Sequence, residues 1–290
     1  MKAMTEQIVN SKRKEALAGL LDDPAPIVQE ALKSEFMRLG TAGRLLLQSI
    51  LLEAEGEQKR CAESLLESIY GPDPSRMLME FIQSLQYELE SGLILINRVI
   101  NPDLDVNALR EQLDALAARC TQLLVHPLSP LEQCKVINRV LFHEEGFRGE
   151  LEWQGNPRSS CLGKVLEEKK GSPSILTSIY ILVAQRIGLD LEPIALPGQF
   201  MVGCFKMDWP VYIDPFQNGR TRSLEEMYAM LVDLEIEPEM HHLAPSPVGE
   251  VLYRICGELA GIYDRRGQVE RAGIFKTCIR SFEETHQQKN

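Results

Sequence analysis

The stretch from Ser160 to Gly219 combines the side chains and the alternation of helix, strand and turn signals that a nucleophilic enzyme requires. In such a site a Cys or Ser at a helix start is the nucleophile, a His activates it, and a third polar group orients the His. Here a helix begins at Ser172 and Pro173, Gln199 stands at the start of a later strand, and Asp214 ends the next strand. This order of elements makes the stretch the candidate site.

The elements that must position these residues can be predicted from the apolar periodicity. Ser172 can cap free helix amides and Pro173 suits the first turn, so we predict a largely apolar helix that ends at Gly188. After this glycine the pattern changes to the two-residue repeat of strands. We predict three short strands, at Leu191–Leu196, Phe200–Phe205 and Val211–Ile213.

Motifs across residues 84–222 resemble those of the bacterial transglutaminase-like core family, the SirB-type proteins with tetratricopeptide-like tails. They are YELE (Tyr87–Glu90), NPDLD (Asn101–Asp105), NRVLF (Asn138–Phe142), GFRG, VLEEKKGSP, LPGQF and YIDPF. The resemblance implies an α+β, mostly helical fold with a papain-like transglutaminase core, in which a central helix packs on a small antiparallel sheet. It also implies a helical N-terminal cap and a C-terminal helix hairpin.

The same resemblance implies that two catalytic residues are replaced. Transglutaminase-type enzymes have Gly-x-Cys at the start of the central helix, whereas this chain has Gly-Ser-Pro, so Pro173 occupies the nucleophile position. The family's LPGHF is LPGQF here, so Gln199 stands in place of the base, and an amide cannot take a proton near neutral pH. Only Asp214 matches the third position.

We therefore predict a non-catalytic protein whose remnant cleft binds a protein, a peptide or a small polar ligand. Repeat-type helical flanks favour protein partners, because stacked helices present extended surfaces. The predicted cleft is lined by Ser172, Ser174, Gln199, Phe200, Trp209 and Asp214.

The alternative is a cysteine or serine hydrolase or acyltransferase with a relocated nucleophile and base. Cys161, near the start of a short helix, and Ser174 are the candidate nucleophiles, with a distant His as the base. Each also has a structural explanation, because a free Cys packs as a small hydrophobe and a Ser can cap a helix. Cys204 lies five residues after Gln199, so strand alternation places it on the opposite face.

The sequence indicates neither a cofactor nor a metal. The seven cysteines are scattered without CxxC pairs, which favours neither a disulfide framework nor a structural zinc site. His241 and His242 are adjacent, and adjacent side chains point apart, so we do not expect them to share a metal.

Composition and charge limit the classes of partner. A net charge of −11 and a pI near 5.1 argue against binding to nucleic acid or to an anionic membrane. The N-terminal run lacks the apolar core of a secretory signal, and no apolar run approaches the ~20 residues of a membrane span. We expect a cytoplasmic protein with a protein or peptide partner.

Turn signals divide the chain into three parts. Residues 1–70 are predicted to form a helical cap, in which LLDDPAPIVQEALKSEFMRLG resembles one HEAT-type unit. A linker at Gly71–Pro74 leads to the transglutaminase-like core, residues 76–235. Residues 248–284 are predicted to form a helix hairpin that resembles a single tetratricopeptide unit.

Overall fold

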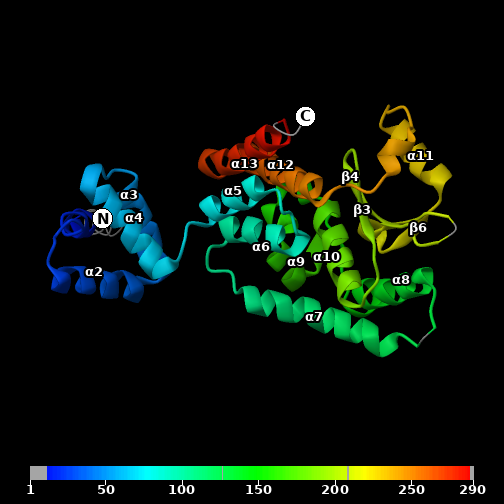
Figure 1. The fold of residues 1–290 in the computed structure, drawn as a ribbon, viewed down its shortest axis with the longest axis horizontal. Coiled ribbons are helices and arrows are strands. Elements are labelled where there is room, and N and C mark those ends of the chain that lie inside the picture. Colours follow the sequence, from blue (N-terminus) through cyan, green and yellow to red (C-terminus); the bar gives the residue numbers. More distant parts are fainter. Residues whose placement is uncertain (1–11, 126, 208, 288–290) are drawn as a thin grey trace, which may run out of the picture. The chain divides into compact units, whose positions relative to one another are not determined.

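The computed structural model describes residues 12–125, 127–207 and 209–287 (Figure 1). The fold is α+β and mostly helical, which confirms the fold class predicted from the sequence. The chain divides into two compact units, Met1–Arg76 and Met77–Asn290. All the candidate site residues lie in the second unit.

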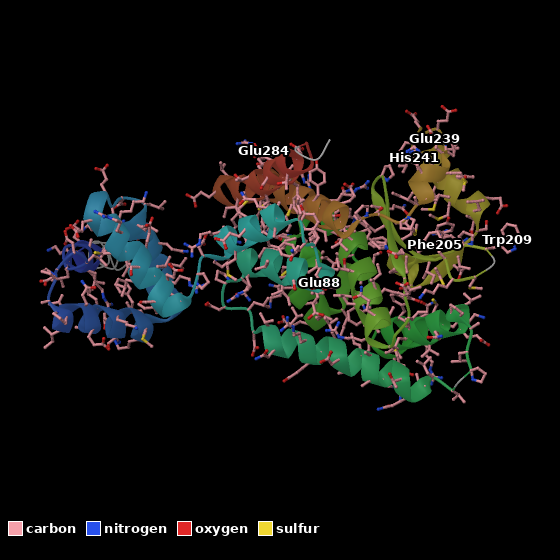
Figure 2. The ribbon with its side chains drawn as sticks, in the orientation of Figure 1. Glu88, Phe205, Trp209, Glu239, His241 and Glu284 are labelled. Carbon is pink, nitrogen blue, oxygen red and sulfur yellow. The ribbon has the colours of Figure 1, made fainter. Side chains whose placement is uncertain are left out.

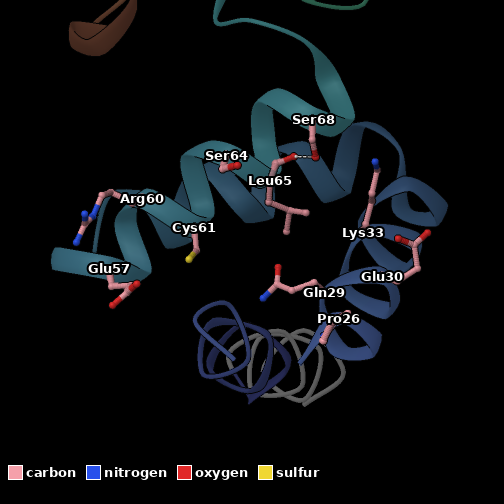
Figure 3. A pocket seen from close by; sticks show the side chains of 10 residues that line it. All are labelled: Pro26, Gln29, Glu30, Lys33, Glu57, Arg60, Cys61, Ser64, Leu65 and Ser68. Atoms are coloured by element: carbon pink, nitrogen blue, oxygen red, sulfur yellow. Dashed lines mark hydrogen bonds between the residues drawn. The ribbon is translucent and has the colours of Figure 1, made fainter. Parts of the chain in front are cut away.

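The first unit is helical. Residues 12–18 form a helix that precedes α2 (Pro26–Leu39), α3 (Thr41–Leu51) and α4 (Gly56–Tyr70). The apolar faces of these helices meet in a small core that contains Phe36 and Leu47. An open pocket of about 500 Å³ lies between α2 and α4, with Cys61 in its wall (Figure 3).

The second unit is organised around α10 (Pro173–Arg186), in which every residue from Pro173 to Ala184 is buried. Ser172 caps this helix by accepting a hydrogen bond from the backbone N–H of Ile175, as its sequence start predicts. Other helices of this unit are α5 (Pro74–Ser84), α6 (Leu89–Ile100), α7 (Val106–Leu123), α8 (Pro130–Asn138), the π-helical turn Arg139–Glu144, and α9 (Leu162–Glu168).

A four-stranded antiparallel sheet packs on α10. Its strands, in spatial order, are β3 (Glu192–Leu196), β4 (Gln199–Cys204), β5 (Val211–Asp214) and β6 (Arg220–Arg222). The sequence predicted the first three of these strands but not β6, because Arg-Thr-Arg carries no apolar alternation. A separate parallel ladder joins β1 (Arg148–Gly149) to β2 (Lys170–Gly171), just before α10.

The C-terminal hairpin belongs to the second unit. It consists of α12 (Val248–Arg265) and α13 (Val269–Gln287), and α11 (Leu224–Asp233) precedes it. The hairpin shares one continuous apolar core with α6 and α10, so it is not the separate part that the sequence suggested. Gly92 of α6 permits this packing, because a Cβ there would lie 2.4 Å from a methyl carbon of Leu252.

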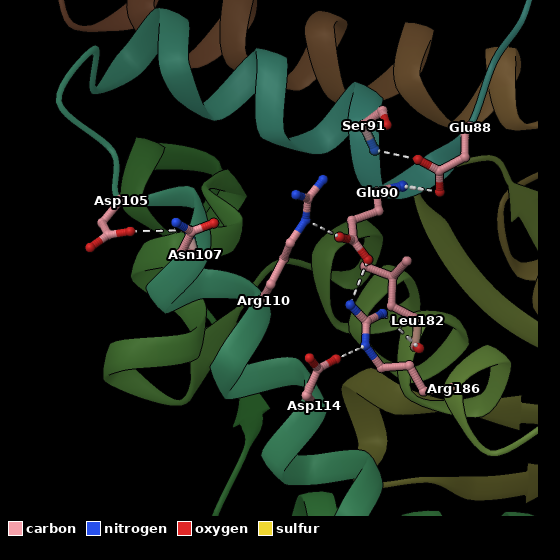
Figure 4. Close-up of polar contacts among 9 residues, drawn as sticks. All are labelled: Glu88, Glu90, Ser91, Asp105, Asn107, Arg110, Asp114, Leu182 and Arg186. Atoms are coloured by element: carbon pink, nitrogen blue, oxygen red, sulfur yellow. Dashed lines mark hydrogen bonds and ion pairs between the residues drawn. The ribbon is translucent and has the colours of Figure 1, made fainter.

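An ion-pair network fixes the C-terminal end of α10 (Figure 4). Arg186 contacts Glu90 of α6 through Nη2 at 2.6 Å and Asp114 of α7 through Nε at 2.7 Å. Arg110 of α7 adds a second contact to Glu90, at 2.9 Å. The network thereby ties α6 and α7 to the central helix and to each other. Within the described residues, no helix is long and apolar enough to cross a bilayer.

Candidate functional site

A small pocket lies where the start of α10 meets the sheet. Its volume is about 190 Å³. The lining residues are Trp153, Pro173, Gly198, Gln199, Phe200, Asp214, Phe216, Gln217 and Arg222. The fold thus brings the three family positions, Pro173, Gln199 and Asp214, to one cavity.

The residues predicted to occupy the nucleophile and base positions, Pro173 and Gln199, both line this pocket. Pro173 is the first residue of α10, and its side chain consists of carbon and hydrogen only. Gln199 begins β4 and is partly exposed. Among the described residues no hydrogen bond engages its side-chain amide, so this amide is available to a ligand.

Asp214 is held by neighbours other than Gln199. Its side chain is buried, with 3% of the residue exposed. Oδ1 accepts a hydrogen bond from the backbone N–H of Gln217 at 3.1 Å, which starts the 3₁₀ turn Pro215–Gln217. Oδ2 pairs with Nη2 of Arg222 at 2.8 Å. The carboxylate therefore takes part in an Asx-type turn and in an ion pair.

Five of the nine lining residues were not predicted from the sequence, and three of these, Trp153, Phe216 and Arg222, have large side chains. Arg222 lies on the short polar strand β6, and Trp153 lies in a 3₁₀ turn within an irregular loop. Phe216 lies two residues after Asp214 in the YIDPF motif, in the turn that follows β5. The direction of a side chain in such a turn cannot be predicted from the strand pattern. Of these three residues, only Phe216 belongs to a motif that was recognised in the sequence, YIDPF.

The side chains of Ser172 and Ser174 do not line this pocket but are buried behind Pro173. Their hydroxyls lie 2.9 Å apart, and Ser174 Oγ donates to Oε2 of Glu258 at 2.7 Å. Ser160 Oγ reaches the same carboxylate oxygen at 3.4 Å. Both serines predicted for the cleft therefore face helix α12 of the hairpin, because a buried hydroxyl needs a partner there.

Glu258 is an unpredicted titratable residue on α12, partly buried overall, whose carboxyl contacts the buried hydroxyl of Ser174. Burial raises the pKa of its carboxyl to about 7, although the hydroxyls of Ser174 and Ser160 favour the ionised form. The carboxyl is thus poised to change protonation near neutral pH. The serine–carboxyl contact is closed to ligands, because the Ser174 side chain is fully buried.

Trp209 is also placed away from the pocket. It lies in the loop between β4 and β5, 81% exposed, and its side chain points outward from the sheet (Figure 2). The aromatic residue that lines the pocket is Trp153 instead. Long loops carry no periodicity that would reveal this from the sequence.

Cys161 lacks the environment of a reactive thiol. It is 3% exposed, and its Sγ donates to Oδ1 of Asn97 at 2.8 Å. Burial raises the pKa of this thiol, whereas a nucleophilic Cys needs a lowered one. Cys204 is likewise buried in the core. Neither thiol lines the pocket at the start of α10.

Thiol labelling gives a direct check of this placement. Cys61 is only partly buried, while the other six cysteines are buried. We expect iodoacetamide near neutral pH to label Cys61 first, and Cys61→Ser to remove the fast phase. Rapid labelling of Cys161 in the folded protein would contradict the environment described above.

The histidine pair lies in a 3₁₀ turn, Met240–Leu243, with its rings 4.0 Å apart. Nδ1 of His241 lies 3.1 Å from Oε2 of Glu239, and Nδ1 of His242 accepts from the Glu239 backbone N–H (Figure 2 labels His241 and Glu239). Among the residues that the structure describes, no group of three or more His, Cys, Asp or Glu side chains is placed to hold a metal.

The fold and the gathered family positions agree with the comparison to known families. Residues 107–257, just over half of the chain, match the transglutaminase-like superfamily. The chain belongs to this superfamily, and the resemblance drawn from its motifs is confirmed.

The relatives are bacterial and eukaryotic. The UPF0162 protein of Xylella fastidiosa (strain 9a5c) is 31% identical over 195 residues, which cover 63% of this chain and 68% of that protein. Protein SirB1 of Salmonella typhimurium is 27% identical over 131 residues, or 45% of this chain and 48% of SirB1. F-box only protein 21 of Mus musculus is 26% identical over 140 residues, which cover 45% of this chain and 22% of that protein. No solved structure matches the chain significantly.

Proposed function

We propose that this chain is a non-catalytic member of the superfamily that binds a peptide segment or a small polar ligand in the pocket at the start of α10. The observation that carries the proposal is the pocket wall itself. Pro173 and Gln199 stand where a nucleophile and a base would be, and the carboxylate of Asp214 is already paired with Arg222. Such a pocket can hold a polar group but has no residue to attack it.

The chemistry of the wall supports an uncharged, hydrogen-bonding ligand group. The two charged side chains, Asp214 and Arg222, neutralise each other, so together they present no net charge to a ligand, while Nε of Arg222 has no hydrogen-bond partner among the described residues. Gln199 can donate and accept a hydrogen bond, and Trp153 and Phe216 supply flat apolar surface. A volume of about 190 Å³ suits one side chain or one peptide group rather than a large cofactor.

The hydrolase alternative has weaker support. Its two candidate nucleophiles, Cys161 and Ser174, are buried and lie outside this pocket. Ser174 does contact a carboxyl of raised pKa, Glu258, but a substrate could reach the hydroxyl only after the hairpin moved. A protein or peptide partner and a cytoplasmic location complete the proposal, and neither depends on a metal or cofactor.

The two tryptophans provide an internal test of binding, because the chain contains no others. Trp153 lines the pocket, whereas Trp209 is exposed outside it. Binding can be followed by NMR through the indole N–H resonances of the two tryptophans. In a titration with a set of N-acetyl amino-acid N-methylamides, we expect at least one amide to shift the Trp153 resonance saturably and to leave the Trp209 resonance unchanged. Gln199→Leu should weaken this binding about tenfold, the size of one lost hydrogen bond.

The matched control is Gln185→Leu, which makes the same change at an exposed position of α10. It should leave the affinity unchanged. The proposal fails if no amide shifts the Trp153 signal. It also fails if a bound amide is hydrolysed or transamidated and Cys161→Ser abolishes that turnover. The hydrolase or acyltransferase alternative would then be correct.

A further inference from the structure

The C-terminal hairpin carries a second, larger groove that shares no lining residue with the pocket at α10. Its volume is about 580 Å³. The lining residues come from α12, the residue that precedes it, and α13: Pro247, Gly249, Glu250, Tyr253, Phe282 and Glu283. This size falls within the range of about 300–1,000 Å³ that is typical of ligand pockets.

The groove has a packed aromatic wall. The rings of Tyr253 and Phe282 are 6.1 Å apart and perpendicular, and Phe282 continues to Tyr87 at 5.6 Å and to Phe81 beyond it, at 5.8 Å from Tyr87. Gly249 lets Tyr87 approach α12, since a Cβ at that position would lie 2.6 Å from the Tyr87 ring. The rings are thus fixed by mutual packing and form a preformed surface.

The charged residues that line the groove are both acidic. Glu283 accepts a hydrogen bond from the Tyr253 hydroxyl at 3.1 Å, and among the described residues no cation pairs with it. Glu250 pairs with Nε of Arg254 at 2.7 Å, but Arg254 also donates through Nη1 to the Leu196 carbonyl of the sheet. Among the described residues that line it, the groove therefore combines aromatic side chains with carboxylates and has no basic side chain.

We propose that this groove binds a segment of a partner protein in which a Lys or Arg side chain stands beside an apolar one. The aliphatic stem of such a side chain can lie on the Tyr253 ring, which packs against the buried ring of Phe282, while its cationic head reaches Glu283. The unpaired carboxylate attracts the cation, and the apolar neighbour fills the aromatic groove. The net charge of −11 adds a long-range attraction for basic partners.

Selection of random dodecapeptides displayed on phage, with the full chain as bait, tests this proposal. We expect the enriched sequences to carry Lys or Arg next to an aromatic or aliphatic residue. A synthetic copy of an enriched peptide, followed by fluorescence anisotropy, should lose about tenfold in affinity with Glu283→Lys. Tyr253→Ser should weaken the same peptide by a comparable factor, because it removes the aromatic surface and the partner of Glu283.

Glu284→Lys is the matched control, because it makes the same change of net charge one residue further along α13. Glu284 is exposed and does not line the groove (Figure 2). The proposal predicts that Glu284→Lys leaves the affinity nearly unchanged. Equal losses for the two variants would mean general attraction to an acidic protein and would overturn the site. Enrichment of acidic or uncharged peptides, or of none, would overturn it as well.

Discussion

Arg222→Met is expected to lower the free energy of unfolding of the second unit by about 3 kcal/mol. The substitution keeps an apolar stem of similar length but leaves the Asp214 carboxylate, in a residue that is 3% exposed, without its cation. A buried charge that loses its partner is among the most destabilising single changes. Urea denaturation followed by tryptophan fluorescence measures the effect, because both tryptophans lie in this unit.

The control for this prediction lies two residues away on the same strand. Arg220 also pairs with a carboxylate, Glu226, but its side chain is 58% exposed, compared with 15% for Arg222. Arg220→Met should therefore change stability by less than about 1 kcal/mol. In addition, Asp214→Asn combined with Arg222→Met should be less destabilised than Arg222→Met alone, because no charge then remains buried. Equal losses at positions 220 and 222 would refute the role assigned to the buried pair.

The central helix and its sheet could be predicted because their signals are local. Ser172, Pro173 and Gly188 mark the two ends of α10, and the observed helix runs from Pro173 to Arg186. The strand β4 runs from Gln199 to Cys204, one residue from the predicted bounds at each end. In both elements a turn or cap residue stands beside a clear apolar period, so local preference and burial agree.

The wall of the pocket could be predicted only in part. Pro173, Gln199 and Asp214 were placed together by the family motifs rather than by periodicity, and the structure gathers them. Trp153 and Arg222 come from a loop and a three-residue polar strand, whose positions depend on what they pack against. Sequence patterns do not encode such tertiary placement.

The serines at the start of α10 show why a local explanation can be correct and incomplete. Ser172 does cap the helix, but its hydroxyl and that of Ser174 also meet a carboxylate that lies 84 residues beyond Ser174 in the chain. Glu258 lies far from these serines in the sequence, and only the packing of the hairpin against α10 brings them together. The predicted cleft residues Ser172 and Ser174 were misplaced for this reason.

Glu258→Gln is expected to stabilise the protein at and above neutral pH by about 2–3 kcal/mol relative to wild type. Burial raises the pKa of the Glu258 carboxyl from its ordinary value of 4.5 to about 7. Folding therefore favours the protonated form, and this contribution to stability is complete below pH 4.5 and is lost as the pH rises through about 7. Gln resembles the protonated acid in shape and hydrogen bonding but has no proton to lose.

The difference in unfolding free energy between Glu258→Gln and wild type should thus be smallest near pH 4.5 and should grow with pH until it levels off above about 7. The groups that face the carboxyl are Arg254 on its own helix and the hydroxyls of Ser160, Ser172 and Ser174. None of these serines titrates in this window, so the change with pH belongs to Glu258. Glu284→Gln, which removes the same charge from an exposed side chain, serves as the matched control. Urea denaturation at several pH values measures these unfolding free energies. If the difference between Glu258→Gln and wild type stays constant with pH, the Glu258 carboxyl is ionised throughout this range and the raised pKa is wrong.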